Sequence, residues 1–537
     1  MKPVTEFLAS GRFFSPEIVL IAGTIVLLLA SLSPKLRERR VEISVSAVLI
    51  LLIAGALVYL NNVLPFQAEG ARPLYLDLGN GNKILRVDKM GAFFKGLFLT
   101  IAALGVVLSV KSKEILSEHY AEYCALILSV TLGMILMATA VDMLMVYLAV
   151  ETVSILSYVL AGFIRGSIRS SEASLKYMLY GALASGIMIY GMSILYGFTG
   201  TTNLLDIKAT LIDRNLGNET MLVLAILFVL AGIGYKMAAV PFHFWCPDVY
   251  EGAPLPVTAF FSVGPKAAGF ALAIRFFVST LTQPFKIGGE EVIIPNMPSA
   301  MVVAKIDWVS AVFWMSILTM TLGNLAALRQ KNAKRLFAYS SIAHAGYLAM
   351  GLTTLTIGGL ESILFYLVVY TIMNLGAFYV VMLVADQRGS DDIQAFRGLF
   401  KDSPWIAIAM TMFLFSLTGI PPFAGFAGKL VLFGAVIEEA GRQGQDRLWV
   451  LAIIGVINSA ISLFYYARVI RVMLEGALGE EEGHGHAPAA VHRPLAPVTV
   501  SVPAFVLLAV FAVPTLVFGL VFGWLQQLAA WTFAYAV

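Results

Sequence analysis

Charged side chains are scarce in this sequence. Asp, Glu, Lys and Arg make up 13% of its 537 residues, about half the share found in a typical soluble domain. Hydrophobic residues make up 59%. This composition excludes an ordinary water-soluble protein and indicates that the chain lies in a lipid bilayer. Strand-like alternation of polar and apolar residues is also missing, which argues against a membrane β-barrel.

Signatures of bound cofactors and metals are missing as well. The two cysteines, Cys124 and Cys246, lie singly in or beside apolar runs and form neither a disulfide framework nor a metal site. The one Gly-Lys pair, Gly428-Lys429, is followed by Leu and lacks the upstream glycine of a phosphate-binding loop. Flavin, haem and iron–sulfur motifs are lacking. We therefore expect this chain to bind no cofactor and no metal, with any redox chemistry in another subunit.

Apolar runs that can cross about 30 Å of hydrocarbon as a helix recur from end to end. About fourteen lie near residues 16–33, 41–60, 91–110, 119–138, 143–164, 175–197, 221–248, 254–281, 308–328, 336–357, 361–385, 404–436, 447–473 and 500–525. The first run follows an acidic start and lacks a small-residue cleavage site, so we interpret it as a retained helix. The sequence predicts an all-α polytopic membrane protein with about fourteen transmembrane helices.

Basic residues are concentrated in every second loop. They are Lys35, Arg37, Arg39, Arg40, Lys111, Lys113, Arg165, Arg169, Arg329, Lys331, Lys334, Arg335, Arg388, Arg397, Lys401, Arg468, Arg471 and Arg493. The positive-inside rule places these loops in the cytoplasm and both termini on the outer, periplasmic side. The polar loops 61–90 and 198–219 are then external, and each is too short for more than a hairpin. His484 and His486 lie in a segment rich in Gly, which we interpret as a solvated cytoplasmic linker and not as a metal site.

Five ionisable residues fall inside apolar runs: Glu151, Lys236, Lys266, His344 and Lys429. An ionised side chain at the centre of a bilayer costs at least about 2.5 kcal/mol, so such residues are candidates for function and usually have partners. Glu151 is central in the fifth run, Lys266 in the eighth and His344 in the tenth. Lys236 is central in the seventh run if that helix continues to about residue 248. These five residues are the predicted site.

The spacing of these residues indicates an internal repeat. Positions 151 and 236 are 85 residues apart, and so are positions 344 and 429. An offset of 193 carries the fourth to eighth helices onto the ninth to thirteenth. Because each unit has five helices, the second unit is inverted in the membrane relative to the first. The predicted divisions are residues 1–117 for three N-terminal helices, 118–281 and 282–474 for the two repeats, and 475–537 for a cytoplasmic linker and the last helix.

Both repeats also contain helix-breaking residues beside a lysine. Gly232, Gly234 and Pro241 flank Lys236, and Gly419, Pro421, Pro422, Gly425 and Gly428 precede Lys429. Proline removes a backbone donor, and free backbone groups are tolerated at membrane depth only around a polar cavity. Inverted repeats with broken helices at corresponding positions are typical of a transport site near the membrane midplane. We therefore predict that the seventh and twelfth helices are broken and line such a site.

A change in the distance between Glu151 and Lys236 would switch that lysine between holding and releasing a proton, because burial and a nearby carboxylate act on it in opposite directions. The alternative is a fixed ion pair that only joins helices. For His344 the alternative is a histidine held by the hydroxyls of Ser340 and Ser341. Asn324 and Asn374 are interpreted as interhelical hydrogen-bonding residues. The offset of 193 takes Lys266 of the first unit to Ser459 of the second, so the corresponding position in the second unit is polar but uncharged.

Three segments resemble the N-type antiporter-like membrane subunit of respiratory complex I (NADH-quinone oxidoreductase), the NuoN/NdhB family. They read "KMAAVPFHFWCPDVYEGAPLPVTAFFSVGPKAAGFALAIR", "NLAALRQKNAKRLFAYSSIAHAGYLAMGL" and "SLTGIPPFAGFAGK". The resemblance implies fourteen helices, two inverted five-helix repeats, and broken helices seven and twelve. It also implies that Glu151, Lys236, Lys266 and Lys429 match proton-pathway residues, with His344 on the central hydrophilic axis. Sister subunits of the L and M types, and subunits of multisubunit cation/proton antiporters, carry a "W-L-P-x-A-H" pattern where this chain has "FWCPDVYEG".

The resemblance implies a proton-translocating subunit without redox groups of its own. NADH, FMN, iron–sulfur clusters and quinone are then expected in partner subunits, with M-type and K-type subunits as neighbours. Its membrane is expected to be a bacterial inner membrane or a thylakoid-type membrane, with lipids and protons as further partners and no nucleic acid. Alternatives are a ferredoxin-dependent relative of complex I, a subunit of a multisubunit Na⁺/H⁺ antiporter, and an inert membrane scaffold. Cys246 stands where the family more usually has Thr, and we attach no function to it.

Overall fold

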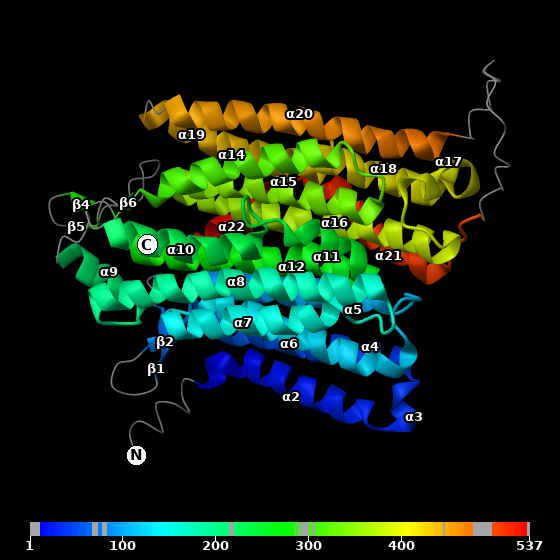
Figure 1. Ribbon diagram of the computed structural model, residues 1–537, viewed down its shortest axis with the longest axis horizontal. Coiled ribbons are helices and arrows are strands. Elements are labelled where there is room, and N and C mark those ends of the chain that lie inside the picture. The colour runs from blue at the N-terminus through cyan, green and yellow to red at the C-terminus, as the bar shows by residue number, and fades with distance from the viewer. Residues whose placement is uncertain are drawn as a thin grey trace.

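The molecule is a bundle of helices that run along a common direction (Figure 1). The computed structural model describes residues 11–66, 73–77, 83–213, 220–284, 286–287, 290–291, 300–302, 307–443, 446–475 and 497–533. The predicted linker with His484, His486 and Arg493 lies outside the described residues.

The N-terminal segment packs along one side of the bundle. Its elements are η1 (Arg12–Phe14), α2 (Ser15–Ser31), α3 (Pro34–Arg37), α4 (Arg40–Val58), η2 (Tyr59–Val63), η3 (Leu64–Phe66), β1 (Leu74–Asp77), β2 (Lys83–Val87) and α5 (Lys89–Ser109). Helix α2 packs on α6 of the next segment, and α5 packs on α6 and α12. Exposed Leu, Ile and Val side chains cover the outer faces of α2 and α4, as expected for helices in contact with lipid.

Two five-helix units follow the N-terminal segment, and a last helical segment packs against the second. The first unit contains η4 (Ser117–His119), α6 (Tyr120–Thr139), α7 (Met143–Ala161), α8 (Ile168–Thr199), α9 (Leu204–Asp213), α10 (Thr220–Met237), α11 (Trp245–Gly252), α12 (Leu255–Ala273), η5 (Ile274–Val278) and α13 (Ser279–Leu281). The second contains α14 (Trp308–Ala327), α15 (Ala333–Thr353), α16 (Ile357–Arg388), η7 (Ile393–Phe396), α17 (Leu399–Asp402), α18 (Pro404–Thr418), α19 (Ala424–Gln443) and α20 (Asp446–Leu474). The last segment contains α21 (Val502–Leu520) and α22 (Gly523–Phe533).

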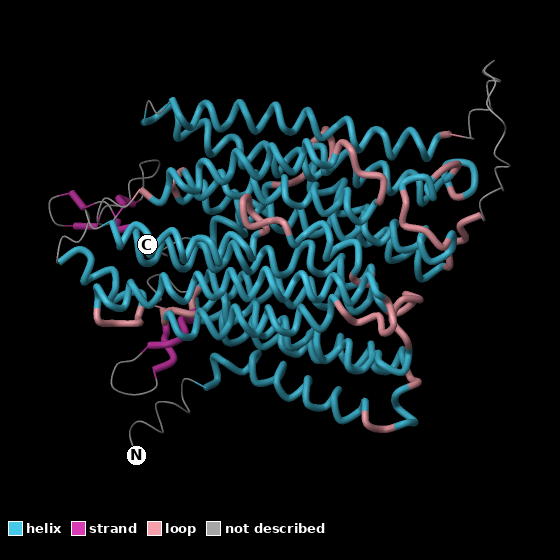
Figure 2. Tube along the Cα trace, viewed as in Figure 1, coloured by secondary structure: helices cyan, strands magenta, loops and turns pink. Residues whose placement is uncertain are grey.

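The two units have the same order of helices and opposite directions. Helix α6 ends at the side of the bundle where the strands lie, whereas α14, its counterpart by the offset of 193, ends at the other side (Figure 1). Both predicted breaks are present, between α10 and α11 and between α18 and α19. Figure 2 shows loop segments inside the bundle, away from both of its ends. The predicted residue boundaries of the segments stay a prediction.

Within the described residues, twelve helices are long and apolar enough to span a membrane. The two predicted spans outside this set are α15 and the broken pair α18–α19. Helix α15 carries Lys334, Arg335 and His344 among several hydroxyls, which lowers its hydropathy, and yet nearly all its residues are buried. Helix α18 has only 15 residues because the chain breaks after Thr418. Both lie inside the bundle, so the prediction of about fourteen crossings agrees with this fold.

The predicted basic loops lie together at one end of the bundle. Arg40 donates to the carbonyl of Ser112, and Lys113 donates to the carbonyl of Asp386. Arg468 donates to the carbonyl of Gln330. We call this the basic end. The opposite end holds the described strands (Figure 2) and both the first and the last described helical turns.

An ion pair at the opposite end ties the N-terminal segment to the first unit. Asp88 caps α5 by accepting from the amide of Gly91 at 2.7 Å, and Arg275 of η5 donates to both Asp88 oxygens at 2.6 and 2.8 Å. Burial raises the pKa of Asp88, but the guanidinium groups of Arg275 and Arg86 outweigh it and hold that pKa well below its usual range. Within loop 61–90, β1 pairs with β2 antiparallel beside this cap. Four further strands have three residues or fewer each. They are β3 (Thr282–Pro284), which pairs with β6 (Ala300–Val302), and β4 (Lys286–Ile287), which pairs with β5 (Glu290–Glu291), both pairs antiparallel.

Candidate functional site

Lys236 lies in the last turn of α10, directly before the first helix break. Its side chain is 1% exposed. Among the described residues, its Nζ has no hydrogen-bond partner, and it lies 5.8 Å from the centroid of the Tyr235 ring. The break begins at Ala238, which has a φ of 56°. That left-handed conformation is uncommon for a residue other than glycine and stores strain beside Lys236.

Glu151 lies in the middle of α7, and the structure does not hold it in an ion pair with Lys236. Its Oε1 is buried and, like Lys236 Nζ, lacks a hydrogen-bond partner in the described part of the chain. The carboxylate is still near enough to act on Lys236 electrostatically. A buried lysine and a half-buried glutamate are therefore close to each other without a hydrogen bond or ion pair between them. This arrangement differs from the fixed ion pair that the sequence left open as the alternative.

Lys266 lies in α12, which is buried along its whole length. Its Nζ donates to Ser341 Oγ at 2.5 Å and lies 3.7 Å from Cys246 Sγ. The ring of Tyr250 is 5.4 Å away. Cys246, to which the sequence analysis gave no function, is thus a direct neighbour of a predicted site residue. The two partners of Lys266 come from different units, Cys246 from α11 and Ser341 from α15.

His344 lies in α15 among aromatic side chains. Its Nδ1 is 2.7 Å from the hydroxyl of Tyr366 in α16, and the Tyr370 ring is 5.0 Å from its own. The serines expected to hold it are engaged elsewhere: Ser340 with Tyr466 at 2.5 Å, and Ser341 with Lys266. The alternative in which Ser340 and Ser341 hold His344 therefore does not match the structure. Tyr366 supplies the hydroxyl instead.

Lys429 lies in the second turn of α19, after the second helix break. Its Nζ donates to the carbonyls of Leu417 at 3.1 Å and Thr418 at 2.7 Å, and to Ser459 Oγ at 2.8 Å. The two carbonyls belong to the C-terminal end of α18, where free carbonyls carry partial negative charge. Gly419 has a φ of 91°, and a Cβ there would lie 2.8 Å from Lys429 Cδ. Glycine at this position therefore both ends α18 and leaves room for the lysine.

One face of α15 connects the two halves of the site. Ser341, His344 and Tyr347 follow at intervals of three residues and so lie on one face. Ser341 contacts Lys266, and the Tyr347 ring lies 4.9 Å from Lys429 Nζ. The structure thus places Lys266, His344 and Lys429 along one buried polar line. Such a line is suited to passing protons between side chains, because the hydroxyl and imidazole groups between the lysines can both donate and accept hydrogen bonds.

Several polar residues of this line were missed or only partly understood from the sequence. Tyr366 and Tyr347 stand in stretches that look like ordinary apolar helix. Asn324 was expected to bond between helices, and it does: it donates to Tyr347 at 2.9 Å and to Asn458 at 3.2 Å. Asn374 likewise donates to Ser262 at 2.6 Å. Both interhelical predictions are confirmed.

The comparison with protein families agrees with this geometry. The family described as "NADH:quinone oxidoreductase/Mrp antiporter, TM" matches residues 140–288 and 285–462, which together span more than half of the chain. This chain belongs to that family. The matched residues include all five predicted site residues.

Relatives within the family are similar over nearly the whole chain. NADH-quinone oxidoreductase subunit N of Anaeromyxobacter sp. (strain Fw109-5) is 46% identical, with 98% of this chain and 97% of the relative covered. This similarity confirms the predicted resemblance to N-type subunits.

Solved structures of the family have the same fold. A chain in the structure of respiratory complex I from Thermus thermophilus with bound aureothin is 30% identical, with a TM-score of 0.70 and coverage of 96% of this chain and 99% of that one. A chain of the Mrp complex from Dietzia sp. DQ12-45-1b has a TM-score of 0.75 with 96% of both chains covered, but only 20% identity. The second likeness shows the fold alone.

Proposed function

We propose that this chain translocates protons as a membrane-arm subunit of NADH-quinone oxidoreductase, using Glu151, Lys236, Lys266, His344 and Lys429. The observation that carries the proposal is the buried line of titratable groups from Lys266 through His344 to Lys429. Lys236 adds a buried ammonium that has no hydrogen-bond partner among the described residues. Keeping these groups in the hydrocarbon is costly, so they are expected to serve transport.

The proposed path runs from the basic end toward the opposite end. A proton is taken up at the basic end and held near Lys236 or Lys266. A change in the separation of Glu151 and Lys236, driven by quinone chemistry in partner subunits, moves the proton along α15 through His344. Lys429 receives it and releases it at the other end. Because the basic end faces the cytoplasm under the positive-inside rule, the path is directed outward.

The finer assignments follow from the same proposal. The chain is a non-redox subunit of the translocase, and NADH, FMN, iron–sulfur clusters and quinone belong to its partners. Within the described ranges, no three His, Cys, Asp or Glu side chains gather into a metal-binding group. M-type and K-type subunits are the proposed neighbours, and a bacterial inner membrane or a thylakoid-type membrane is the proposed location, with both termini on the outer side.

The test combines two assays on membranes that carry Lys236→Ala, after a native gel has verified assembly. NADH-driven quinone reduction and acidification across the membrane should fall together, because the two are coupled through this lysine. Lys35→Ala, at an exposed position of α3, is the control and should leave both unchanged. Normal rates of both in assembled Lys236→Ala complex would contradict the proposal and favour an inert scaffold.

A Na⁺/H⁺ antiporter is the second candidate, favoured by the fold shared with the Mrp complex chain. It predicts Na⁺-dependent proton movement in vesicles that contain the purified complex and no NADH. Proton movement that requires NADH and quinone, and is independent of Na⁺, would exclude it.

A further inference from the structure

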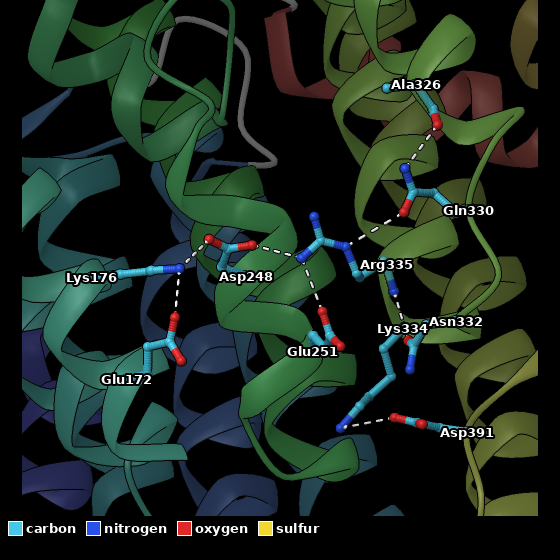
Figure 3. Close-up of polar contacts among 10 residues, drawn as sticks. All are labelled: Glu172, Lys176, Asp248, Glu251, Ala326, Gln330, Asn332, Lys334, Arg335 and Asp391. Carbon is cyan, nitrogen blue, oxygen red and sulfur yellow. Dashed lines mark hydrogen bonds and ion pairs between the residues drawn. The ribbon is translucent and has the colours of Figure 1, made fainter. Parts of the chain in front are cut away.

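Charged side chains from three helices meet between the two units at the basic end (Figure 3). Arg335 of α15 reaches Asp248 at 2.6 Å and Glu251 at 2.9 Å, both in α11. Lys176 of α8 reaches Asp248 from the other side at 2.7 Å. A cleft of about 250 Å³ lies among these residues. We call the Arg335 pairs with Asp248 and Glu251 the α11 clamp.

The clamp joins the two elements that hold Lys266. Cys246, near the start of α11, lies 3.7 Å from Lys266 Nζ, and Ser341, six residues after Arg335 in α15, accepts its hydrogen bond. A shift of α11 relative to α15 would therefore pull the two partners of Lys266 apart. Asp248 is only two residues after Cys246, so little of the motion would be lost between the clamp and the lysine.

Half-helix α11 depends on such tertiary contacts for its position. It has eight residues, too few to be stable as an isolated helix. The break after Met237 also separates it from α10. The Arg335 and Asp248 side chains are 27% and 31% exposed, so the pair is more shielded than an ordinary surface ion pair. A planar guanidinium that binds two carboxylates also fixes the geometry of the contact, which a lysine ammonium does not.

We infer that Arg335 is a positioning residue of the proton path: its clamp on α11 keeps Cys246 and Ser341 together around Lys266. This inference rests on the proposed function for its consequence in transport, but its structural claim stands separately. Lys334, the neighbouring basic residue, has other partners: Asp391 at 3.5 Å (Figure 3) and the carbonyl of Ala253 at 3.1 Å. Lys334 thus contacts the backbone at the C-terminal end of α11, whereas the ion pairs with the α11 carboxylates are those of Arg335.

The chain supplies its own reporter for the position of α11. Cys246 and Cys124 are its two cysteines, and both are fully buried. The rate at which N-ethylmaleimide labels each one in the assembled complex is measured by mass spectrometry of the separate peptides. Arg335→Gln should raise the labelling rate of Cys246 about tenfold, a change within the range of couplings between contacting residues. Cys124, in α6, should keep its rate.

Two further variants separate positioning from general loss of structure. Arg335→Lys keeps the positive charge but not the fixed geometry of the guanidinium, so it should restore only part of the protection of Cys246. Lys176→Met removes the outer pair with Asp248, together with the pair that Lys176 forms with Glu172 in its own helix, and keeps the clamp. It should change labelling by about twofold or less, as expected for a more exposed pair. Unchanged Cys246 labelling in assembled Arg335→Gln complex would overturn the inference. An equal rise at Cys124 would overturn it too, since the change would then not be confined to α11.

Transport assays separate this inference from the proposed function. Arg335→Gln should slow NADH-driven quinone reduction and acidification together, and Arg335→Lys should recover only part of both. If Lys266→Met leaves both activities normal, Lys266 does not serve in the proposed function, whatever the labelling shows. If Lys266→Met abolishes them while Arg335→Gln leaves them unchanged, the proposed function stands and the positioning role of Arg335 is wrong.

Discussion

The two units place their central lysines in opposite surroundings. Lys236 precedes its helix break, and its Nζ has no hydrogen-bond partner among the described residues. Lys429 follows its break, and its Nζ donates to two carbonyls at the end of α18 and to Ser459. The partner residues differ as well: Glu151 of the first unit corresponds to His344 of the second. Related sequences in an inverted arrangement thus give one lysine that is loosely held and one that is firmly held.

This difference indicates a division of work. A buried ammonium without partners is destabilising, so a small change nearby can make Lys236 release its proton. An ammonium with three acceptors is stable in its site and is suited to receiving a proton from the line through α15. The first unit would then respond to the driving reaction, and the second would hold and deliver the proton.

The largest effect is expected from Glu151→Gln. The substitution keeps the shape of the side chain and removes the carboxylate charge that acts on Lys236. Quinone reduction and acidification should both fall at least about tenfold, a modest share of what a positioned proton-transfer group contributes. Assembly should be normal, because the Oε1 atom of Glu151 has no hydrogen bond to lose. Glu42→Gln, at an exposed position of α4, is the control. Wild-type rates in Glu151→Gln would mean that Lys236 does not depend on this charge.

A smaller loss is expected from Tyr366→Phe in the second unit. The change removes the hydroxyl 2.7 Å from His344 Nδ1 and leaves that buried nitrogen without its partner. If this hydrogen bond contributes about 1 kcal/mol to the rate-limiting step, its loss corresponds to a rate about fivefold lower. Steady-state quinone reduction by the assembled complex measures it. Tyr339→Phe, at a half-buried position of the same helix as His344, should have no effect. A full rate in Tyr366→Phe would exclude the hydroxyl from the path.

The smallest effect is expected from Ser459→Ala. Lys429 would lose one of its three acceptors and keep both carbonyls of α18. The free energy of unfolding should fall by about 1 kcal/mol, measured as a lower midpoint of thermal unfolding in the purified complex, with little change in activity. A loss of activity as large as that of Glu151→Gln would show that Lys429 is not firmly held, and the contrast between the units would then fail.

Much of the fold followed from the sequence because membranes impose simple rules. Hydrophobic length, loop charge and helix-breaking residues predicted the crossings, the gathering of basic loops and both breaks. The side of the first break on which Lys236 lies was not predicted, because helix-breaking residues flank this lysine and the outcome depends on where the helix ends. Ala238, in the left-handed region, ends α10 two residues after Lys236, and no residue type announces that conformation there.

The site was predicted less completely than the fold. The charged members stood out because charge is rare in these helices. Tyr366 did not, since a tyrosine in an apolar run resembles ordinary core. Cys246 was interpreted as a substitution without function, and Arg335 as a marker of membrane topology. The reason is that their contacts, Cys246 with Lys266 and Arg335 with Asp248, join segments distant in sequence. The contact of Arg335 with Asp248 depends on packing between the two units, and that of Cys246 with Lys266 depends on packing of α11 against α12. The spacing of residues along the chain reports neither.

The most direct test of the contrast between the units is the thermal unfolding of two matched variants, Lys236→Met and Lys429→Met, in the purified complex. Methionine keeps much of the length of lysine and removes the charge. Lys236→Met should unfold at the wild-type temperature or above it, because it removes a buried ammonium that lacks a partner. Lys429→Met should unfold at a lower temperature, because it leaves the carbonyl of Leu417 without this donor, at a cost of about 1–3 kcal/mol for a buried group, and leaves the carbonyl of Thr418 with Ser459 Oγ alone. Equal destabilisation by the two substitutions would contradict the account.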